Sequence, residues 1–190
     1  MDQSTVRSSP RQTVPATTSQ KVDSEEQYLT FALGGESYAI GILAIKEIIE
    51  YEPLTVVPMM PEHVRGVINL RGAVVPVIDL HVRFGRPCAA ATSRTCIVIV
   101  ETFAHGEKQD IGVVVDAVNA VISIPDAAIE APPALGGRAR SPFIRGLGKI
   151  NERFVILLDL DQVLSEQEAL ELASLGTAAP DPVATSPARS

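Results

Sequence analysis

The stretch VRGVINLRGAVVPVIDL, residues Val64–Leu80, and the stretch IRGLGKINERFVILLDL, residues Ile144–Leu160, lie 80 positions apart and align without a gap. Both open near an Arg-Gly pair and close with an apolar run followed by Asp-Leu. Strand-forming residues on either side of a turn predict a β-hairpin in each stretch. A second pair of blocks, Tyr38–Ile49 and Ile111–Ile122, aligns at an offset of 73. Two matching pairs in the same order indicate a duplicated unit of about four or five strands.

The composition favours a core built from aliphatic side chains. Hydrophobic residues make up 46% of the 190 positions, and the chain contains no Trp, 5 Phe and 3 Tyr. Val and Ile are favoured in strands because their branched side chains pack well on a pleated surface. A unit of about five strands can close into a small barrel, which removes its exposed edges. Since one such barrel has little core, we expect two barrels side by side over a shared aliphatic seam.

The chain divides into an ordered body and two polar tails. The N-terminal tail is rich in Ser, Thr and Gln, and the C-terminal tail is rich in Pro, so both are expected to be disordered. A capping box at Ser165–Glu168 predicts a final helix. The expected boundaries are a tail over 1–24, a body over 25–175 with a first barrel mostly in 28–84, a second mostly in 95–164 and a helix over about 166–175, and a tail over 176–190.

Charge and hydropathy exclude several classes of protein. The net charge of −7 argues against a nucleic-acid binder, which normally presents a basic face, and against a polybasic membrane anchor. No apolar run approaches the length of a spanning helix, and the N-terminus lacks the apolar region of a secretory signal. Cys88 and Cys96 lack metal-type spacing and are expected to be free thiols in the cytoplasm.

Motifs for catalysis or cofactor binding are absent from the sequence. His63, His81 and His105 are scattered, and no P-loop, GxGxxG or GxSxG motif occurs. Asp79 and Asp159 end the two aligned stretches and could form a carboxylate pair, as in an aspartyl hydrolase. Each of them also precedes a short segment that it could cap as an N-terminal carboxylate, and this second reading is favoured. We therefore expect no enzyme activity, no cofactor, no metal and no small-molecule substrate.

The chain strongly resembles the CheW family, the adaptor proteins of bacterial chemotaxis, in the block VRGVINLRGAVVPVIDLHVRFG at Val64–Gly85. YAIGILAIKEIIEY, IGVVVDAVNAVISI and FIRGLGKINERFVILLDLDQVLS resemble further family blocks in the right order. The resemblance covers about residues 25–175 and implies a mainly all-β fold of two five-stranded SH3-like β-barrel subdomains. It also implies a non-enzymatic adaptor that couples the cytoplasmic tip of methyl-accepting chemoreceptors to the regulatory domain of the CheA histidine kinase.

The resemblance also implies which residues contact receptor or kinase: Ile45, Glu47, Gly66 and Arg71, with Cys96 and Val121 at positions of apolar groove residues. Structural roles compete with this reading, namely core packing for Ile45 and a backbone requirement for Gly66. Arg71 is more telling, because the second copy has Asn151 at the same turn, so the turn itself does not demand arginine. An exposed arginine is well suited to binding carboxylates or carbonyls of a partner.

This chain departs from the family pattern at two places. Its N-terminal tail is longer than usual, and Gly41 stands where an acidic residue is often found. An adaptor of this kind is expected in the cytoplasm, recruited to membrane-associated receptor arrays without inserting into the membrane. The alternative within the family is a scaffold for a chemosensory pathway that controls pili, development or a second messenger.

Overall fold

The computed structural model describes residues 25–104, 107–132, 143–150 and 152–163. The predicted tails and the predicted helix over 166–175 lie outside these residues. Among the described residues, no helix has the length and apolar character needed to cross a bilayer. The elements are β1 (Glu25–Leu33), β2 (Glu36–Gly41), η1 (Ile42–Ala44), β3 (Ile45–Glu50), β4 (Val64–Leu70), β5 (Ala73–Asp79), α1 (Leu80–Arg83), β6 (Cys96–Ala104), β7 (Glu107–Val115), β8 (Ala117–Pro125), η2 (Asp126–Ala128), β9 (Ile129–Glu130), β10 (Ile144–Ile150), β11 (Arg153–Leu158) and η3 (Leu160–Gln162).

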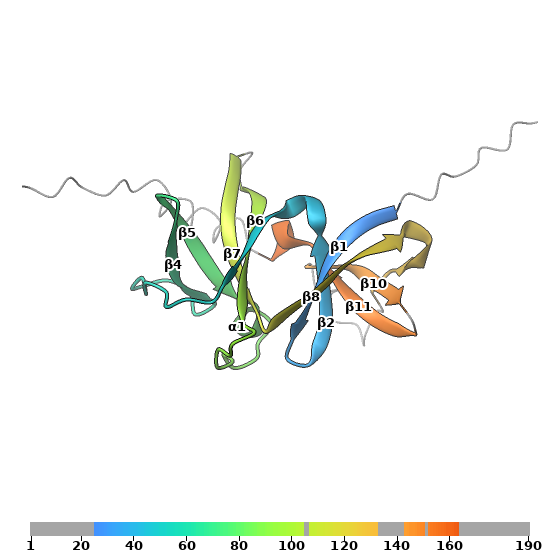
Figure 1. Cartoon of the computed structure of the whole chain (residues 1–190), viewed down its shortest axis with the longest axis horizontal. Coiled ribbons are helices and arrows are strands. Elements are labelled where there is room, and N and C mark those ends of the chain that lie inside the picture. The colour runs from blue at the N-terminus through green and yellow to red at the C-terminus, as the bar shows by residue number, and fades with distance from the viewer. Residues whose placement is uncertain (1–24, 105–106, 133–142, 151, 164–190) are drawn as a thin grey trace, which may run out of the picture.

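The strands form two sheets that stand side by side (Figure 1). The six-stranded sheet has the order β8-β1-β2-β11-β10-β9, and the five-stranded sheet has the order β3-β6-β7-β5-β4. The predicted all-β class and the two aligned hairpins, β4–β5 and β10–β11, are confirmed. The chain bends at Asp116, between β7 and β8.

The predicted division into one barrel per copy is wrong. β1 and β2 belong to the six-stranded sheet with β8–β11, while β6 and β7 belong to the five-stranded sheet with β3–β5. Each copy therefore places its first two strands in the sheet built on the other copy's hairpin. Equivalent parallel pairings make this exchange: β11 pairs with β2, and β5 pairs with β7. The apolar pattern of a strand specifies which face is buried but not which of two similar sheets receives it.

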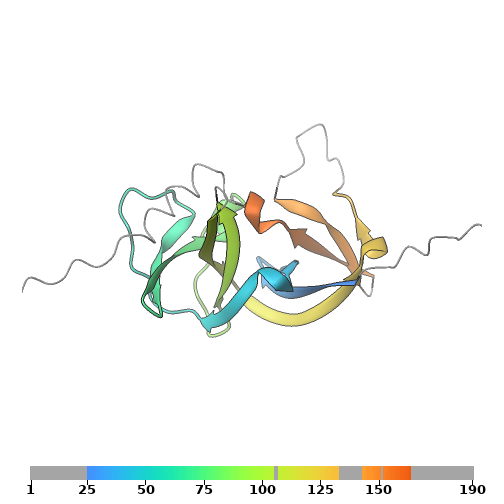
Figure 2. The same ribbon diagram turned by 90° about the horizontal axis from the view of Figure 1, so that it is seen from above.

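Each sheet curls so that its two edges are linked by continuous chain (Figure 2). In the six-stranded sheet, the edge strand β8 leads through η2 into β9 at the opposite edge. In the five-stranded sheet, the chain after the edge strand β3 reaches Thr55, which bridges Val67 of β4 at the opposite edge. This curling agrees with the expected barrel-like subdomains.

Three apolar clusters form the core. The largest is a seam that joins the sheets, with Phe31 and Ile40 from the six-stranded sheet packed with Val98 and Ile111 from the five-stranded sheet. Two smaller clusters lie within the sheets, one around Ile97 and one around Leu157. Nearly all of these side chains are aliphatic, so the shared seam predicted from composition is confirmed.

Within the described residues the chain passes from one sheet to the other at two places. The η1 crossing, Ile42–Ala44, leads from β2 to β3, and the Asp116 crossing leads from β7 to β8. Leu43 and Asp116 are 73 positions apart, which is the offset of the duplicated blocks. The two crossings are therefore equivalent positions of the repeat, and their side chains can be compared directly.

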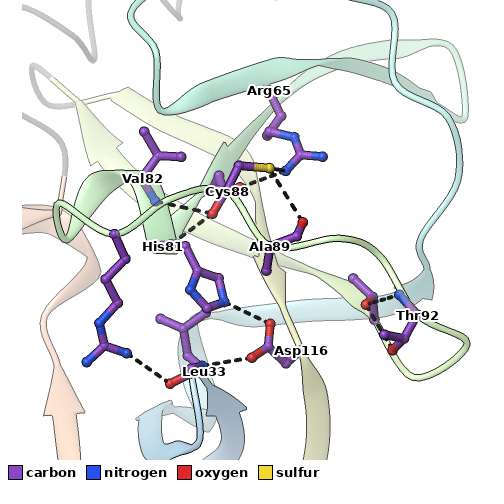
Figure 3. A network of polar contacts seen from close by, with 12 residues as sticks. Leu33, Arg65, His81, Val82, Cys88, Ala89, Thr92 and Asp116 are labelled. Atoms are coloured by element: carbon purple, nitrogen blue, oxygen red, sulfur yellow. Dashed lines mark hydrogen bonds and ion pairs between the residues drawn. The ribbon is translucent and has the colours of Figure 1, made fainter.

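A polar network holds the Asp116 crossing (Figure 3). The Asp116 carboxylate contacts His81 Nε2 at 2.8 Å and accepts a hydrogen bond from the Gly34 amide at 2.7 Å. The Asp116 amide in turn donates to the carbonyl of Ala32 at 3.0 Å. His81 follows β5 of the five-stranded sheet, whereas Ala32 and Gly34 belong to the β1–β2 hairpin of the six-stranded sheet. One carboxylate thus ties together elements of both sheets.

Asp79 and Asp159 have the capping role predicted for them. Asp79 is buried, accepts hydrogen bonds from the amides of His81 and Val82, and pairs with Arg65 at 2.7 Å. Asp159 accepts a hydrogen bond from the Asp161 amide at 3.2 Å at the start of η3. Both carboxylates are committed to local structure, so neither is positioned as one half of a catalytic pair.

Candidate functional site

A groove of about 870 Å³ lies at the η1 crossing. Both sheets contribute to it, because its walls come from β1, β2, β8, β10 and the end of β11 on one side and from β6 on the other. The residues that line it are Glu25, Glu26, Gln27, Ile40, Gly41, Ile42, Leu43, Ala44, Glu101, Phe103, Ser123, Arg145, Leu158, Asp159, Leu160 and Asp161.

Two large apolar side chains stand in this groove unburied. Leu43 is 99% exposed and Phe103 is 58% exposed. Leu43 is the central residue of the short η1, whose neighbours Ile42 and Ala44 are half-buried, so the tight turn projects Leu43 outward. Single exposed leucines are common on surfaces, but apolar groups gathered in a concave site are typical of a place where another molecule binds.

Two carboxylates of the groove, Glu101 and Glu26, are paired with cations of the same chain. Glu101 contacts Lys108 at 2.6 Å and Lys46 at 3.2 Å, and Lys46 also contacts Asp110 at 2.6 Å. The hydrogen bond from Lys108, followed by that from Lys46, holds the pKa of Glu101 below its ordinary value. The carboxylate is therefore ionised at neutral pH and has its counter-ions in place.

Glu26 is held in the same way on β1. Its carboxylate accepts hydrogen bonds from Arg145 Nη1 at 2.9 Å and from the Tyr28 hydroxyl at 2.6 Å. The bond from Arg145 is the main reason that the pKa of Glu26 lies below its ordinary value. Burial raises the pKa of Tyr28 to about 12, so the phenol remains a donor. A partner entering the groove meets apolar side chains beside carboxylates that need no further counter-ion.

The structure brings together two residues predicted as binding residues, Arg71 and Glu47. Arg71 Nη2 contacts Glu47 Oε2 at 2.7 Å, joining the tip of the β4–β5 hairpin to the edge strand β3. Arg71 has a φ of 53° and is followed by Gly72 with a φ of 91°, as in the tight turns that suit two-residue hairpins. The Arg71 side chain is 80% exposed, whereas that of Glu47 is 23% exposed. Arg71 thus remains open to a partner while it pairs with Glu47.

Gly66 has a structural reason to be glycine. Its φ is +147°, and a Cβ atom at this position would lie 2.4 Å from the carbonyl oxygen of Thr55. The register of the β4–β5 pair shifts between Val64 and Gly66, where Thr55 crosses the edge. Any side chain would push the Thr55 segment away from β4, so the backbone requirement weighed for Gly66 is present.

None of the six predicted binding residues belongs to the described lining of the groove. Ile45 and Cys96 are half-buried and pack against the seam. Val121 is 49% exposed on β8, opposite Leu29. Cys88 and Cys96 are both free thiols, as expected. A role for Ile45, Cys96 or Val121 in binding remains a prediction.

Leu43 and Phe103, the most exposed apolar residues of the groove, escaped the sequence reasoning. The run YAIGILAIKEII reads as apolar alternation, in which Leu43 looks like one more strand residue. A signal was present in the aligned copy, where Asp116 occupies the equivalent position. A polar residue there indicates a break in the strand rather than a buried position.

Comparisons with known proteins agree on one family. A model of the CheW-like domain matches residues 27–168. The chemotaxis protein CheW of Klebsiella aerogenes is 36% identical over 143 residues, covering 75% of this chain and 84% of that protein. The probable chemotaxis protein CheW of Rhizobium etli is 32% identical over 145 residues, covering 76% and 91%. The crystal structure of the scaffolding protein TtCheW from Thermoanaerobacter tengcongensis matches with a TM-score of 0.67 and 33% identity, covering 76% of this chain and 97% of that one.

Proposed function

The chain belongs to the CheW family, whose members are chemotaxis adaptor and scaffolding proteins rather than enzymes, and from this premise we propose that it couples chemoreceptors to a CheA histidine kinase. In this proposal the groove at the η1 crossing receives the helical hairpin tip of a receptor. The face around Arg71 and Glu47 receives the regulatory domain of the kinase. The chain itself carries out no chemical step.

The groove is the observation that carries the proposal. It contains the exposed side chains of Leu43 and Phe103, and its carboxylates Glu26 and Glu101 are already neutralised by cations of the same chain. Burying one exposed leucine side chain contributes about 1.5–3 kcal/mol. A helix that lays an apolar face into a groove obtains its affinity in this way. The ion pairs of Glu26 and Glu101 reduce the cost of excluding water from these two carboxylates, because each keeps its counter-ion when a partner docks.

The Arg71–Glu47 pair supports a second surface. The pair lies at a hairpin tip and the neighbouring edge strand β3, where Ile48 is 42% exposed. An exposed arginine beside an exposed apolar side chain can bind carboxylates or carbonyls of a partner. Both partners held on one rigid body reach a high effective concentration for each other, so receptor state can bias the kinase.

Reversal of the charge at Arg71 tests this assignment. We expect Arg71→Glu to leave the thermal melt nearly unchanged, because the side chain is exposed and its pair is a surface ion pair of about 0–1 kcal/mol. Receptor-dependent control of the kinase, measured as kinase activity with a receptor fragment and CheA, should be abolished. If Arg71→Glu unfolds the protein instead, Arg71 is structural and the assignment fails.

Two further variants make the result specific. Arg153→Glu places the same charge reversal at the start of β11 in the second copy, and it should retain kinase control. Glu47→Arg combined with Arg71→Glu restores an internal pair of opposite polarity. If this double variant recovers full coupling, Arg71 acts by positioning Glu47 rather than by contacting the kinase. If it remains uncoupled, the arginine itself contacts the partner.

The pathway in which this adaptor works is part of the proposal. We propose recruitment to receptor arrays at the membrane and output through chemotaxis, with control of pili, development or a second messenger as the alternative. Affinity purification of the full chain from its native cell, followed by identification of the bound kinase and receptors, separates these outputs. A kinase other than a CheA-type kinase would overturn the proposal as a whole.

A further inference from the structure

Gly41 is a glycine that neither the backbone nor the packing requires. It ends β2 and precedes η1 with φ −59° and ψ 131°, a conformation open to any residue. A Cβ atom at Gly41 would meet no atom within 4 Å. By contrast, a Cβ at Gly148 would lie 2.9 Å from Ile124 and one at Gly66 would lie 2.4 Å from the Thr55 carbonyl. The fold therefore does not explain why position 41 lacks a side chain.

That consequence is added space inside the groove. Gly41 lines the groove between Ile40 and the η1 residues, close in sequence to the fully exposed Leu43. Across the groove stands the exposed ring of Phe103. Any side chain larger than hydrogen at position 41 would extend from a half-buried strand end into open space lined by these groups.

The chemistry of the neighbouring groups defines what can fill this space. Glu26 is bound to Arg145, and Glu101 is bound to Lys46 and Lys108. These ion pairs are complete without a ligand, so they offer no advantage to a charged group of a partner. The lining also has exposed polar side chains, those of Glu25, Gln27, Ser123 and Asp161. The large apolar side chains of Leu43 and Phe103 are exposed as well, however, and Leu43 lies two residues from Gly41. The space beside Gly41 therefore favours a large apolar side chain.

We propose that Gly41 is a specificity determinant of the groove, admitting a partner helix that inserts a large apolar side chain beside Leu43. This inference rests on the proposed docking function and names the chemistry of the partner that this chain selects. An acidic side chain at position 41 would occupy the space and lose water when the helix docks, because the cations described at the groove, Arg145, Lys46 and Lys108, already pair with Glu26 and Glu101. A pocket of this kind discriminates by about 10-fold to 200-fold per group of methylene size.

Binding of a receptor's cytoplasmic hairpin fragment to the full chain, measured by titration calorimetry, tests the proposal. The receptor is one encoded in the same genome. We expect Gly41→Asp to bind the fragment at least about tenfold more weakly than the parent chain. Ser37→Asp is the matched control, because it adds the same side chain at an exposed position of the same strand β2, and it should bind like the parent.

Every outcome of this experiment decides between alternatives. Gly41→Asp that melts like the parent and binds the fragment equally well would overturn the role of Gly41 while leaving the docking function intact. A parent chain that does not bind the fragment overturns the docking function, and the inference falls with it. A Gly41→Ala variant that fails to fold would show that the glycine is structural and would also overturn the inference. Shortening the apolar tip residues of the fragment to alanine should remove the difference between parent and Gly41→Asp.

Discussion

The two crossings between the sheets occupy the same position of a duplicated unit and have opposite surfaces. At the Asp116 crossing, a carboxylate binds His81 and the Gly34 amide and so closes the junction with polar contacts. At the η1 crossing, Leu43 makes the equivalent turn and is 99% exposed beside a groove of about 870 Å³. One copy of the turn stabilises the arrangement of the sheets, and the other leaves an apolar side chain exposed beside the groove. We propose that duplication has allowed one position to serve stability and its copy to serve binding.

The largest effect on stability is expected from breaking the polar contacts of the Asp116 crossing. Asp116→Ala removes the acceptor of His81 Nε2 and of the Gly34 amide, and His81 is buried. Loss of two hydrogen bonds to a charged group, with a buried donor left unsatisfied, should cost about 3 kcal/mol of unfolding free energy. The shift of the urea midpoint measures it.

Two substitutions of His81 separate the hydrogen bond from ring packing at the Asp116 crossing. His81→Gln retains a nitrogen donor that can reach Asp116, whereas His81→Leu has similar bulk without a donor. We expect His81→Leu to lose most of the stability lost by Asp116→Ala and His81→Gln to lose clearly less. Equal losses in the two variants would mean that ring packing, and not the bond to Asp116, holds the junction.

An intermediate effect, on binding affinity alone, is expected at the η1 crossing. Leu43→Ser should change the unfolding free energy by less than about 0.5 kcal/mol, because the side chain is exposed. Its affinity for the receptor fragment should fall at least about tenfold, or about 1.4 kcal/mol. Phe154→Ser is the control, since Phe154 is 52% exposed on β11 outside the described lining of the groove. Equal affinities of the two variants would place the receptor elsewhere.

The smallest effect concerns the ion pair of Glu26 and Arg145. The pKa of Glu26 is lowered in the folded chain, so the pair contributes stability above the carboxyl pKa of the unfolded chain. That contribution is lost as the pH falls through the lower pKa of the folded state. Parent and Glu26→Gln should therefore differ slightly in urea midpoint at pH 7 and converge once the pH falls below the folded-state pKa of Glu26. A difference that grows in acid would contradict the sign of this linkage.

The sequence predicted the local elements well because their signals are local. The two aligned hairpins, β4–β5 and β10–β11, were indicated by strand-forming residues around a turn, and Asp79 caps α1 as its position suggested. The aliphatic seam followed from a composition with little aromatic content. The ion pair between Arg71 and Glu47 joins two residues that the family resemblance had selected separately.

The exchange of strands and the groove could not be predicted in the same way. Two copies with similar apolar patterns offer β2 a place beside either β5 or β11, and only the three-dimensional packing selects β11. The exposure of Leu43 depends on the turn that follows from this exchange. Phe103 faces the groove because its amide is held by Asp161, more than fifty residues away. No spacing rule connects these residues along the chain.

The proposal that a receptor binds at the η1 crossing is tested most directly by amide hydrogen exchange of the full chain with and without the receptor's cytoplasmic hairpin fragment. We expect slower amide exchange at residues 40–44 and 101–103 on binding, with little change at the amides of Gly34 and Asp116 in the Asp116 crossing. Protection confined to the Asp116 crossing, or to faces away from both crossings, would contradict a binding site at the η1 crossing.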